Sequence, residues 1–201
     1  MSHRILDELQ NQHQQLSLFL YSFRQQIQRF SDPNANTSIF LILEMLDFIN
    51  LFPEQFHHPV EDHIFNLLLK KNISETRLIK DILTQHAALE MTTSRIRDEF
   101  TALASASASP AESLVEDTLE YIDVQMEHLF HEEEEIFPLV DEHFEDQDWL
   151  LIEQAIEPFV TDPEIDAYKT SAMEIIEHFV RIDTSFENPD LDPFTDTQID
   201  D

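Results

Sequence analysis

The clearest periodic pattern in the chain is LIKDILTQHAALEMTTSRIRDEFTAL, residues 78–103. Apolar residues recur along it at steps of three and four, from Leu78 through Ile82 to Phe100. This spacing is typical of an amphipathic helix, because residues three and four apart lie on one helical face. His86 stands on the same apolar stripe. The stretch therefore predicts a long helix whose buried face carries a histidine.

Three further segments show the same period, at about residues 5–27, 37–71 and 111–143. Short stretches rich in Ser, Asn, Asp or Pro separate them: SDPNAN (31–36), NISE (72–75) and SASASPAE (105–112). Pro53 and Pro59 are expected to interrupt the second segment, because proline removes a helical hydrogen bond. Long amphipathic helices with short connections favour an all-α fold, an up-down-up-down four-helix bundle.

Two shorter helical patterns follow, at about residues 147–158 and 163–182, and no linker marks a second domain. The last stretch is acidic and broken by prolines, which is typical of disorder. We expect a bundle over residues 1–145, a helical extension packed on it over 146–182, and a disordered acidic tail over 183–201.

Composition excludes several classes of site. The 201 residues contain no Gly and no Cys. Phosphate-cradling loops and Rossmann turns need Gly, and thiolate metal sites, disulfides and cysteine nucleophiles need Cys. The formal charge of −31 argues against nucleic acid or an anionic membrane as partner and favours cations. No signal-like or membrane-spanning apolar stretch is present, so we expect a cytoplasmic protein.

Histidine and glutamate residues recur at helical spacing. His57 and Glu61 stand four apart in HHPVE, and His128 and Glu132 stand four apart in HLFHE. Residues four apart share a helix face, with Cβ atoms about 5–6 Å from each other, so each pair could hold one ion. His13, like His86, lies on an apolar stripe. Each feature alone is weak, since a lone histidine on an apolar face is usually a core residue.

The heights of these residues make the stronger argument. At each turn, nearly equal numbers of residues lie between the turn and the candidate ligands of the two helices that it joins. Antiparallel packing of these helices would therefore bring the candidates to one level along the bundle axis. That layer would contain His13, His57, Glu61, His86, His128 and Glu132. Imidazole suits iron, copper, nickel and zinc, whereas magnesium and calcium prefer oxygen donors. Six donors exceed the four of a structural zinc and favour a dinuclear site in which the two carboxylates bridge.

The order His, His-x-x-x-Glu, His, His-x-x-x-Glu over residues 3–143 resembles the hemerythrin-like family, the HHE cation-binding domains. The later DWLLIEQAIE (148–157) is similar to an extension found in bacterial members. The resemblance implies a non-haem di-iron centre with an oxo or hydroxo bridge. In this chain it implies terminal ligands at His13, His57, His86 and His128, and bridging ligands at Glu61 and Glu132.

Several assignments stay open. His58 is a candidate additional ligand, or could replace His57 if Asp62 replaced Glu61; Glu133 could replace Glu132. Glu90 stands where oxygen-carrying members have a fifth histidine, and it is either a further ligand or a surface residue. This departure disfavours simple reversible oxygen carriage. The remaining histidines are expected at the surface: His3, His63, His131, His143 and His178.

Three functions follow as expectations. The first is a protein that binds or senses a small diatomic ligand such as oxygen or nitric oxide. The second is a di-iron enzyme handling peroxide or nitric oxide, or an iron donor in the repair of iron–sulfur clusters. The third is a metal-stabilised interaction module that recruits a partner through its C-terminal region. The sequence leaves the oligomeric state open.

Overall fold

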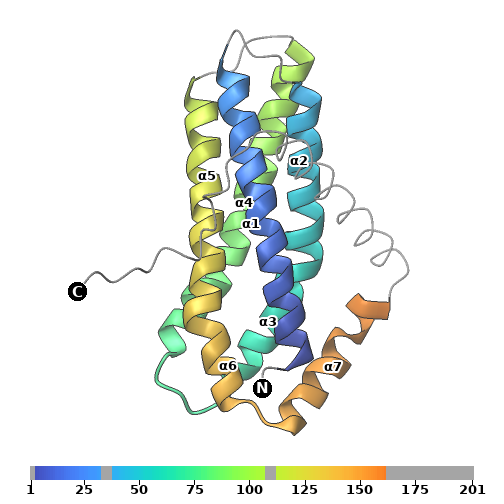
Figure 1. The fold of residues 1–201 in the computed structure, drawn as a ribbon, viewed down its shortest axis with the longest axis vertical. Coiled ribbons are helices and arrows are strands. Elements are labelled where there is room, and N and C mark those ends of the chain that lie inside the picture. Colours follow the sequence, from blue (N-terminus) through green and yellow to red (C-terminus); the bar gives the residue numbers. More distant parts are fainter. Residues whose placement is uncertain (1–2, 33–37, 107–111, 162–201) are drawn as a thin grey trace, which may run out of the picture.

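The structure, a computed structural model, describes residues 3–32, 38–106 and 112–161 (Figure 1). Every regular element in these ranges is helical, which confirms the all-α class. The predicted second C-terminal helix and the acidic tail lie outside the described residues. The elements are α1 (Arg4–Ser31), α2 (Ile39–Phe52), η1 (Pro53–His57), α3 (His58–Leu68), α4 (Thr76–Ala106), α5 (Glu112–His131), η2 (Glu132–Ile136), α6 (Phe137–His143) and α7 (Asp146–Thr161), with η1 and η2 as π-helical turns.

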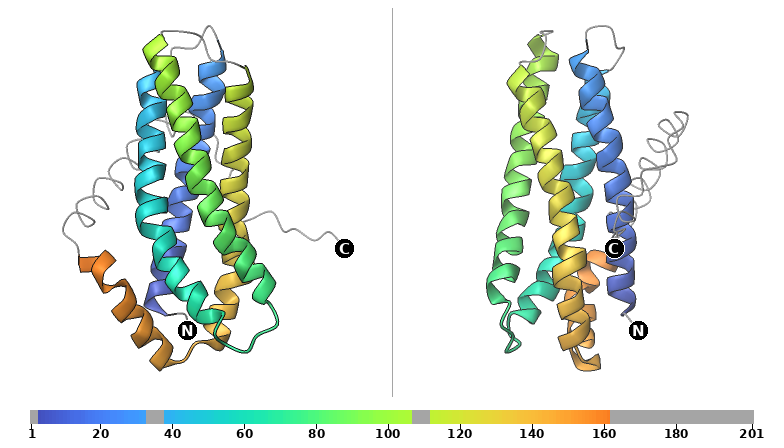
Figure 2. Two further views of the ribbon diagram at one scale, coloured as in Figure 1. Left: turned by 180° about the vertical axis from the view of Figure 1, so that it is seen from behind. Right: turned by 60° about the vertical axis from the view of Figure 1, so that its left-hand side comes forward.

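These elements form four long helical rods that lie side by side (Figures 1 and 2). Two rods are the single helices α1 and α4, and the others are the composite runs α2–η1–α3 and α5–η2–α6. The helices α1 and α4 each pack on both α2 and α5, and the two composite rods also contact each other through α3 and α6. The helix α7 leaves the end of α6 and packs on α3.

The two composite rods pass through proline without breaking. The predicted interruption at Pro53 and Pro59 was wrong, because the chain stays helical there by widening to a π turn. The His58 N–H donates to the carbonyl of Pro53, five residues back. A second π turn at Glu132–Ile136 likewise precedes Pro138 by two residues. Such a wider turn relieves the clash between a proline ring and the preceding turn of helix, and π turns recur at functional sites.

The buried apolar side chains form two separate clusters. We call the cluster that includes Phe19, Phe23 and Phe100 the upper cluster, and the one that includes Phe65 and Val140 the lower cluster. In every rod the chain passes from one cluster to the other across a short polar gap. In α1, for example, the lower cluster ends at residue 9 and the upper one begins at residue 16. The fold therefore holds a buried polar layer between two apolar ones.

Candidate metal centre

The polar gap is filled by seven buried histidine and glutamate side chains, which we call the His/Glu layer. None of the seven is more than 5% exposed. All four rods contribute to it, so the helix packing rather than any loop positions these groups. The layer consists of His13 from α1, His57 from η1, His58 and Glu61 from α3, His86 from α4, His128 from α5 and Glu132 from η2.

One group within the layer contains His13 and His57. Their Nε2 atoms lie 2.8 Å apart, and each lies close to Glu61 Oε1, at 3.1 Å and 3.2 Å respectively. A metal bonded to nitrogen and oxygen at about 2.0–2.2 Å holds neighbouring donor atoms roughly 2.8–3.6 Å apart. The three donor atoms therefore have the spacing that one ion requires.

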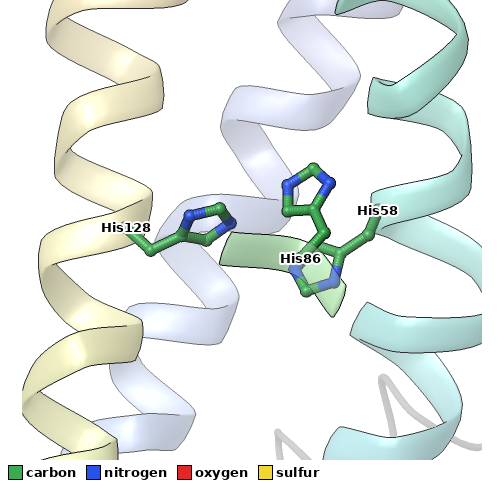
Figure 3. A group of neighbouring side chains, drawn as sticks. All are labelled: His58, His86 and His128. Atoms are coloured by element: carbon green, nitrogen blue, oxygen red, sulfur yellow. The ribbon is translucent and has the colours of Figure 1, made fainter. Parts of the chain in front are cut away.

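The other group contains His58, His86 and His128, whose rings converge from three helices (Figure 3). The rings of His58 and His86 are stacked with centroids 4.3 Å apart, and the His128 ring stands edge-on to His86 at 4.8 Å. Candidate ligand atoms of the three residues all lie within 4.8 Å of one another. The structure thus brings His58 into the layer together with His57, and the groups contain two and three histidines.

The two carboxylates lie between the groups. Glu61 contacts His13 and His57 through Oε1, and its Oε2 lies 3.8 Å from His86 Nε2. Glu132 Oε1 lies 3.1 Å from His86 Nε2. Its Oε2 lies 3.4 Å from His128 Nε2 and 3.6 Å from His13 Nε2. Each carboxylate therefore reaches histidines of both groups, which is the arrangement that a bridging ligand needs.

An outer set of oxygen atoms orients four of the histidines. Carboxylate oxygens can only accept hydrogen bonds, so the histidine nitrogens facing them must donate. A hydrogen held on Nδ1 leaves the Nε2 lone pair of a neutral imidazole free to face the interior. The Nδ1–oxygen pairs are His13 with Glu133 at 3.1 Å, His57 with Gln12 at 2.8 Å, His86 with Asp62 at 2.7 Å and His128 with Gln85 at 3.1 Å.

These outer hydrogen bonds show where the alternative ligand candidates lie. Asp62 and Glu133 lie outside the layer and bond to the outer nitrogens of His86 and His13. Gln10 also donates to Glu133, at 3.1 Å. Glu90 is exposed and belongs to none of the possible metal-holding groups among the described residues. The structure therefore brings together the six residues expected first, adds His58, and leaves out Glu90.

Sequence reasoning missed the two glutamines that orient histidines. Gln12 directly precedes His13 and Gln85 directly precedes His86. Each glutamine bonds to the histidine of a neighbouring rod, not to the one beside it in sequence. The repeated Gln-His pair, on two helices that both contribute to the layer, was the available signal.

Among the histidines expected at the surface, His63 is exposed, whereas His3 has a structural role. The His3 ring accepts a hydrogen bond from the Ile5 N–H at the start of α1 and stacks on Trp149 of α7, with ring centroids 4.1 Å apart. His131 and His143 are half-buried, and His131 pairs with Glu135. His178 lies outside the described residues.

The electrostatics of the layer favour cations. Burial lowers the pKa of His13, but its bonds to Glu133 and Glu61 outweigh burial and raise the pKa to about 10. In the same way Asp62 and Glu132 overcome burial at His86 and raise its pKa to about 10. Without metal, therefore, protons on these two histidines balance the buried carboxylates. Metal ions would take the place of those protons.

Three further members of the layer, His58, His128 and Glu61, have lowered pKa values. Burial, with the neighbouring histidines, lowers the pKa of His58, and burial lowers that of His128 to about 4. Burial acts to raise the pKa of Glu61, yet His57 and His13 hold it well below its ordinary value. His58 and His128 are thus neutral and Glu61 is ionised near pH 7, as metal ligands must be.

Three polar atoms of the layer are buried without a hydrogen-bond partner: Glu61 Oε2, Glu132 Oε2 and His128 Nε2. Such atoms are rare in folded proteins because leaving them unpaired costs free energy. All three belong to side chains that can donate to a metal. The donor set and its unpaired atoms therefore fit divalent cations that accept imidazole and carboxylate ligands.

The sequence of the chain matches a known family. A family model described as the hemerythrin HHE cation binding domain matches residues 4–140, a range that includes the whole His/Glu layer. No curated protein and no solved structure matches the chain. Within the part of the chain that the structure describes, no helix has both the length and the apolar character needed to cross a bilayer.

Proposed function

Because the chain belongs to the hemerythrin family of HHE cation-binding domains, we propose that it is a non-haem di-iron protein. Its function is to bind or sense a small diatomic ligand, oxygen or nitric oxide. His13 and His57 hold one iron, His58, His86 and His128 hold the other, and Glu61 and Glu132 bridge them. The observation that carries this assignment is that each carboxylate contacts histidines of both groups.

The donor set argues against a structural zinc, magnesium or calcium. Five imidazoles and two carboxylates exceed the four ligands of a structural zinc, and magnesium or calcium would need more oxygen. When bound, a pair of irons supplies electrons that a diatomic ligand can accept and return. The assignment gives one iron five protein donors and the other four, so each has room for a further ligand. The protein keeps the imidazoles oriented through Gln12, Gln85, Asp62 and Glu133.

The wider organisation is part of the same proposal. Residues 1–145 form the up-down-up-down bundle, 146–182 an extension packed on it, and 183–201 an acidic tail. The stacking of His3 on Trp149 and the contact of α7 with α3 support the packed extension. A cytoplasmic location is part of the proposal, and the charge of −31 argues against nucleic acid or an anionic membrane as partner.

A di-iron enzyme acting on peroxide or nitric oxide is the second candidate. One observation favours it: a buried carboxyl group, Glu54, lies one helical turn from His58 and has no hydrogen-bond partner. Peroxide consumption by the iron-loaded protein, lost in His86→Ala, would support this candidate over passive binding.

Optical spectra of the iron-loaded protein test the first proposal. We expect a charge-transfer absorption that changes on exposure to oxygen or nitric oxide and returns when the gas is removed under nitrogen. His86→Ala should lose the change, and the control His63→Ala, at an exposed histidine of α3, should keep it. A spectrum that never reverts, or one that His86→Ala leaves unchanged, would contradict the proposal.

A further inference from the structure

Glu54 is a buried carboxylic acid outside the His/Glu layer. It lies in η1, four residues before His58, and is 9% exposed. Neither of its oxygens has a hydrogen-bond partner. Among the described residues, the other buried side-chain atoms that lack a partner all belong to Glu61, His128 and Glu132. Glu54 thus shares with the layer a feature that no other described side chain has.

Glu54 belongs to a second polar level directly above the three-histidine group, on the side of the upper cluster. Gln125 lies one turn above His128 in the same way that Glu54 lies one turn above His58. Gln125 is buried, as are Tyr121 and Thr93 farther along. The neighbours that act on Glu54 electrostatically are Thr93, Glu90 and Tyr121. Two rods, those of α4 and α5, therefore contribute polar groups to the space around Glu54.

The hydroxyl and amide groups of this level are already paired with one another. Gln125 Nε2 donates to the Tyr121 hydroxyl at 2.7 Å. The Tyr121 and Thr93 hydroxyls lie 2.5 Å apart, and Thr93 donates its hydrogen to the Leu89 carbonyl at 3.0 Å. Tyr121 must therefore donate to Thr93, because a hydroxyl has a single hydrogen. In this chain of bonds each hydroxyl hydrogen already has an acceptor, so the Thr93 hydroxyl stabilises an ionised Glu54 only in part.

The surroundings of Glu54 thus favour its protonated form. Burial raises the pKa of Glu54 to about 7, with the Thr93 hydroxyl lowering it in part and the charge of Glu90 adding to the rise. A protonated carboxyl carries one O–H that must find an acceptor when it is buried. No described protein group accepts that hydrogen.

We propose that Glu54 donates a hydrogen bond to the small ligand that binds beside His58, His86 and His128, and so sets which ligands the site prefers. The inference rests on the proposed function, since it requires a ligand held at that group. Ligands with a basic outer atom, such as oxygen, nitric oxide, peroxide or azide, would gain from the bond. Gln125 and Tyr121 line the same level and keep its hydrogen-bonding groups fixed.

Azide binding to the iron-loaded full-length protein tests this inference, with affinity measured from the azide-to-iron absorption. Glu54→Leu removes the donor and should weaken azide binding about 5- to 10-fold, the equivalent of one hydrogen bond. Glu54→Gln keeps an N–H donor and should retain most of the affinity. The control Glu99→Gln, at an exposed glutamate of α4 that pairs with Arg95, should bind azide within about 2-fold of the unsubstituted protein.

Infrared spectroscopy gives a readout that does not depend on turnover. The C=O stretch of a protonated carboxyl should be present, shift when azide binds, and disappear in both Glu54 variants but not in the control Glu99→Gln. The azide stretch should shift in Glu54→Leu. Iron content, measured on every preparation, distinguishes the failures. Full iron with unchanged azide affinity in Glu54→Leu overturns this inference alone, as does iron loss confined to the Glu54 variants, which would make Glu54 a ligand. An unsubstituted protein that holds no iron overturns the proposed function and this inference with it.

Discussion

The bond between Asp62 and His86 gives a quantitative test of the outer oxygen atoms. Asp62 Oδ1 lies 2.7 Å from His86 Nδ1, and its side chain is 44% exposed, so solvent screens part of its charge. Substituting such an acceptor typically lowers metal affinity 10- to 100-fold, about 1.4–2.8 kcal/mol. Because the charge of Asp62 is partly screened, we expect Asp62→Ala to lower the iron affinity about 10-fold, near the lower limit of this range.

Competition with a chelator of known affinity, under nitrogen with ferrous iron, measures this effect. The control is Asp81→Ala, an exposed aspartate of α4 whose partner is Arg77. It should leave the affinity unchanged, which separates the loss of an oriented hydrogen bond from the loss of one surface charge. If Asp62→Ala and Asp81→Ala change iron affinity equally, Asp62 does not orient a ligand and the reasoning fails.

The other predictions concern protons and the core. Loading the metal-free protein with iron at pH 7.5 should release about two protons per chain, because the pKa values of His13 and His86 are raised to about 10 and both must lose a proton to ligate. Calorimetry in buffers of different ionisation enthalpy measures this release. Iron binding without proton release would refute the prediction. In the metal-free protein, the raised pKa of Glu54 contributes stability below about pH 4.5 that is lost as pH rises through about 7. Glu54→Gln should therefore gain stability relative to the unsubstituted protein between pH 5 and pH 8, by at most about 3 kcal/mol, in urea unfolding; a constant difference across that range would contradict this. Phe19→Ala, in the upper cluster, should cost about 3–5 kcal/mol of stability yet leave the iron content unchanged. Iron loss in a folded Phe19→Ala variant would contradict this, because it would show that packing of the upper cluster controls iron binding.

Particular residues show how far sequence reasoning reaches. The helical period of residues 78–103 predicted α4 and its inward-facing His86, because apolar spacing alone determines which face is buried. Equal numbers of residues on the two sides of each turn predicted that four histidines lie at one level along the bundle. This prediction requires only the helical rise per residue and short loops. The composite rods were harder, since the prolines suggested interruptions where the chain instead forms π turns.

The remaining details depend on side-chain direction, which spacing does not determine. An ideal helix turns 100° per residue, so His57 and His58 would not be expected to serve one site together. The structure brings both into the layer next to a π turn, each in a different group. Likewise Glu132 and Glu133 are adjacent, and only the contacts with His86 and His13 separate an inner carboxylate from an outer one. Glu54 gave no sequence signal because an isolated glutamate in an acidic chain looks like surface.

The metal stoichiometry of the full-length protein, isolated without chelators and then loaded with ferrous iron under nitrogen, tests the dinuclear centre most directly. Elemental analysis should find two irons per chain, and fewer in His58→Ala and His13→Ala, each of which removes a ligand from a different group. A single tightly bound ion, or two irons retained in full by both variants, would contradict the account.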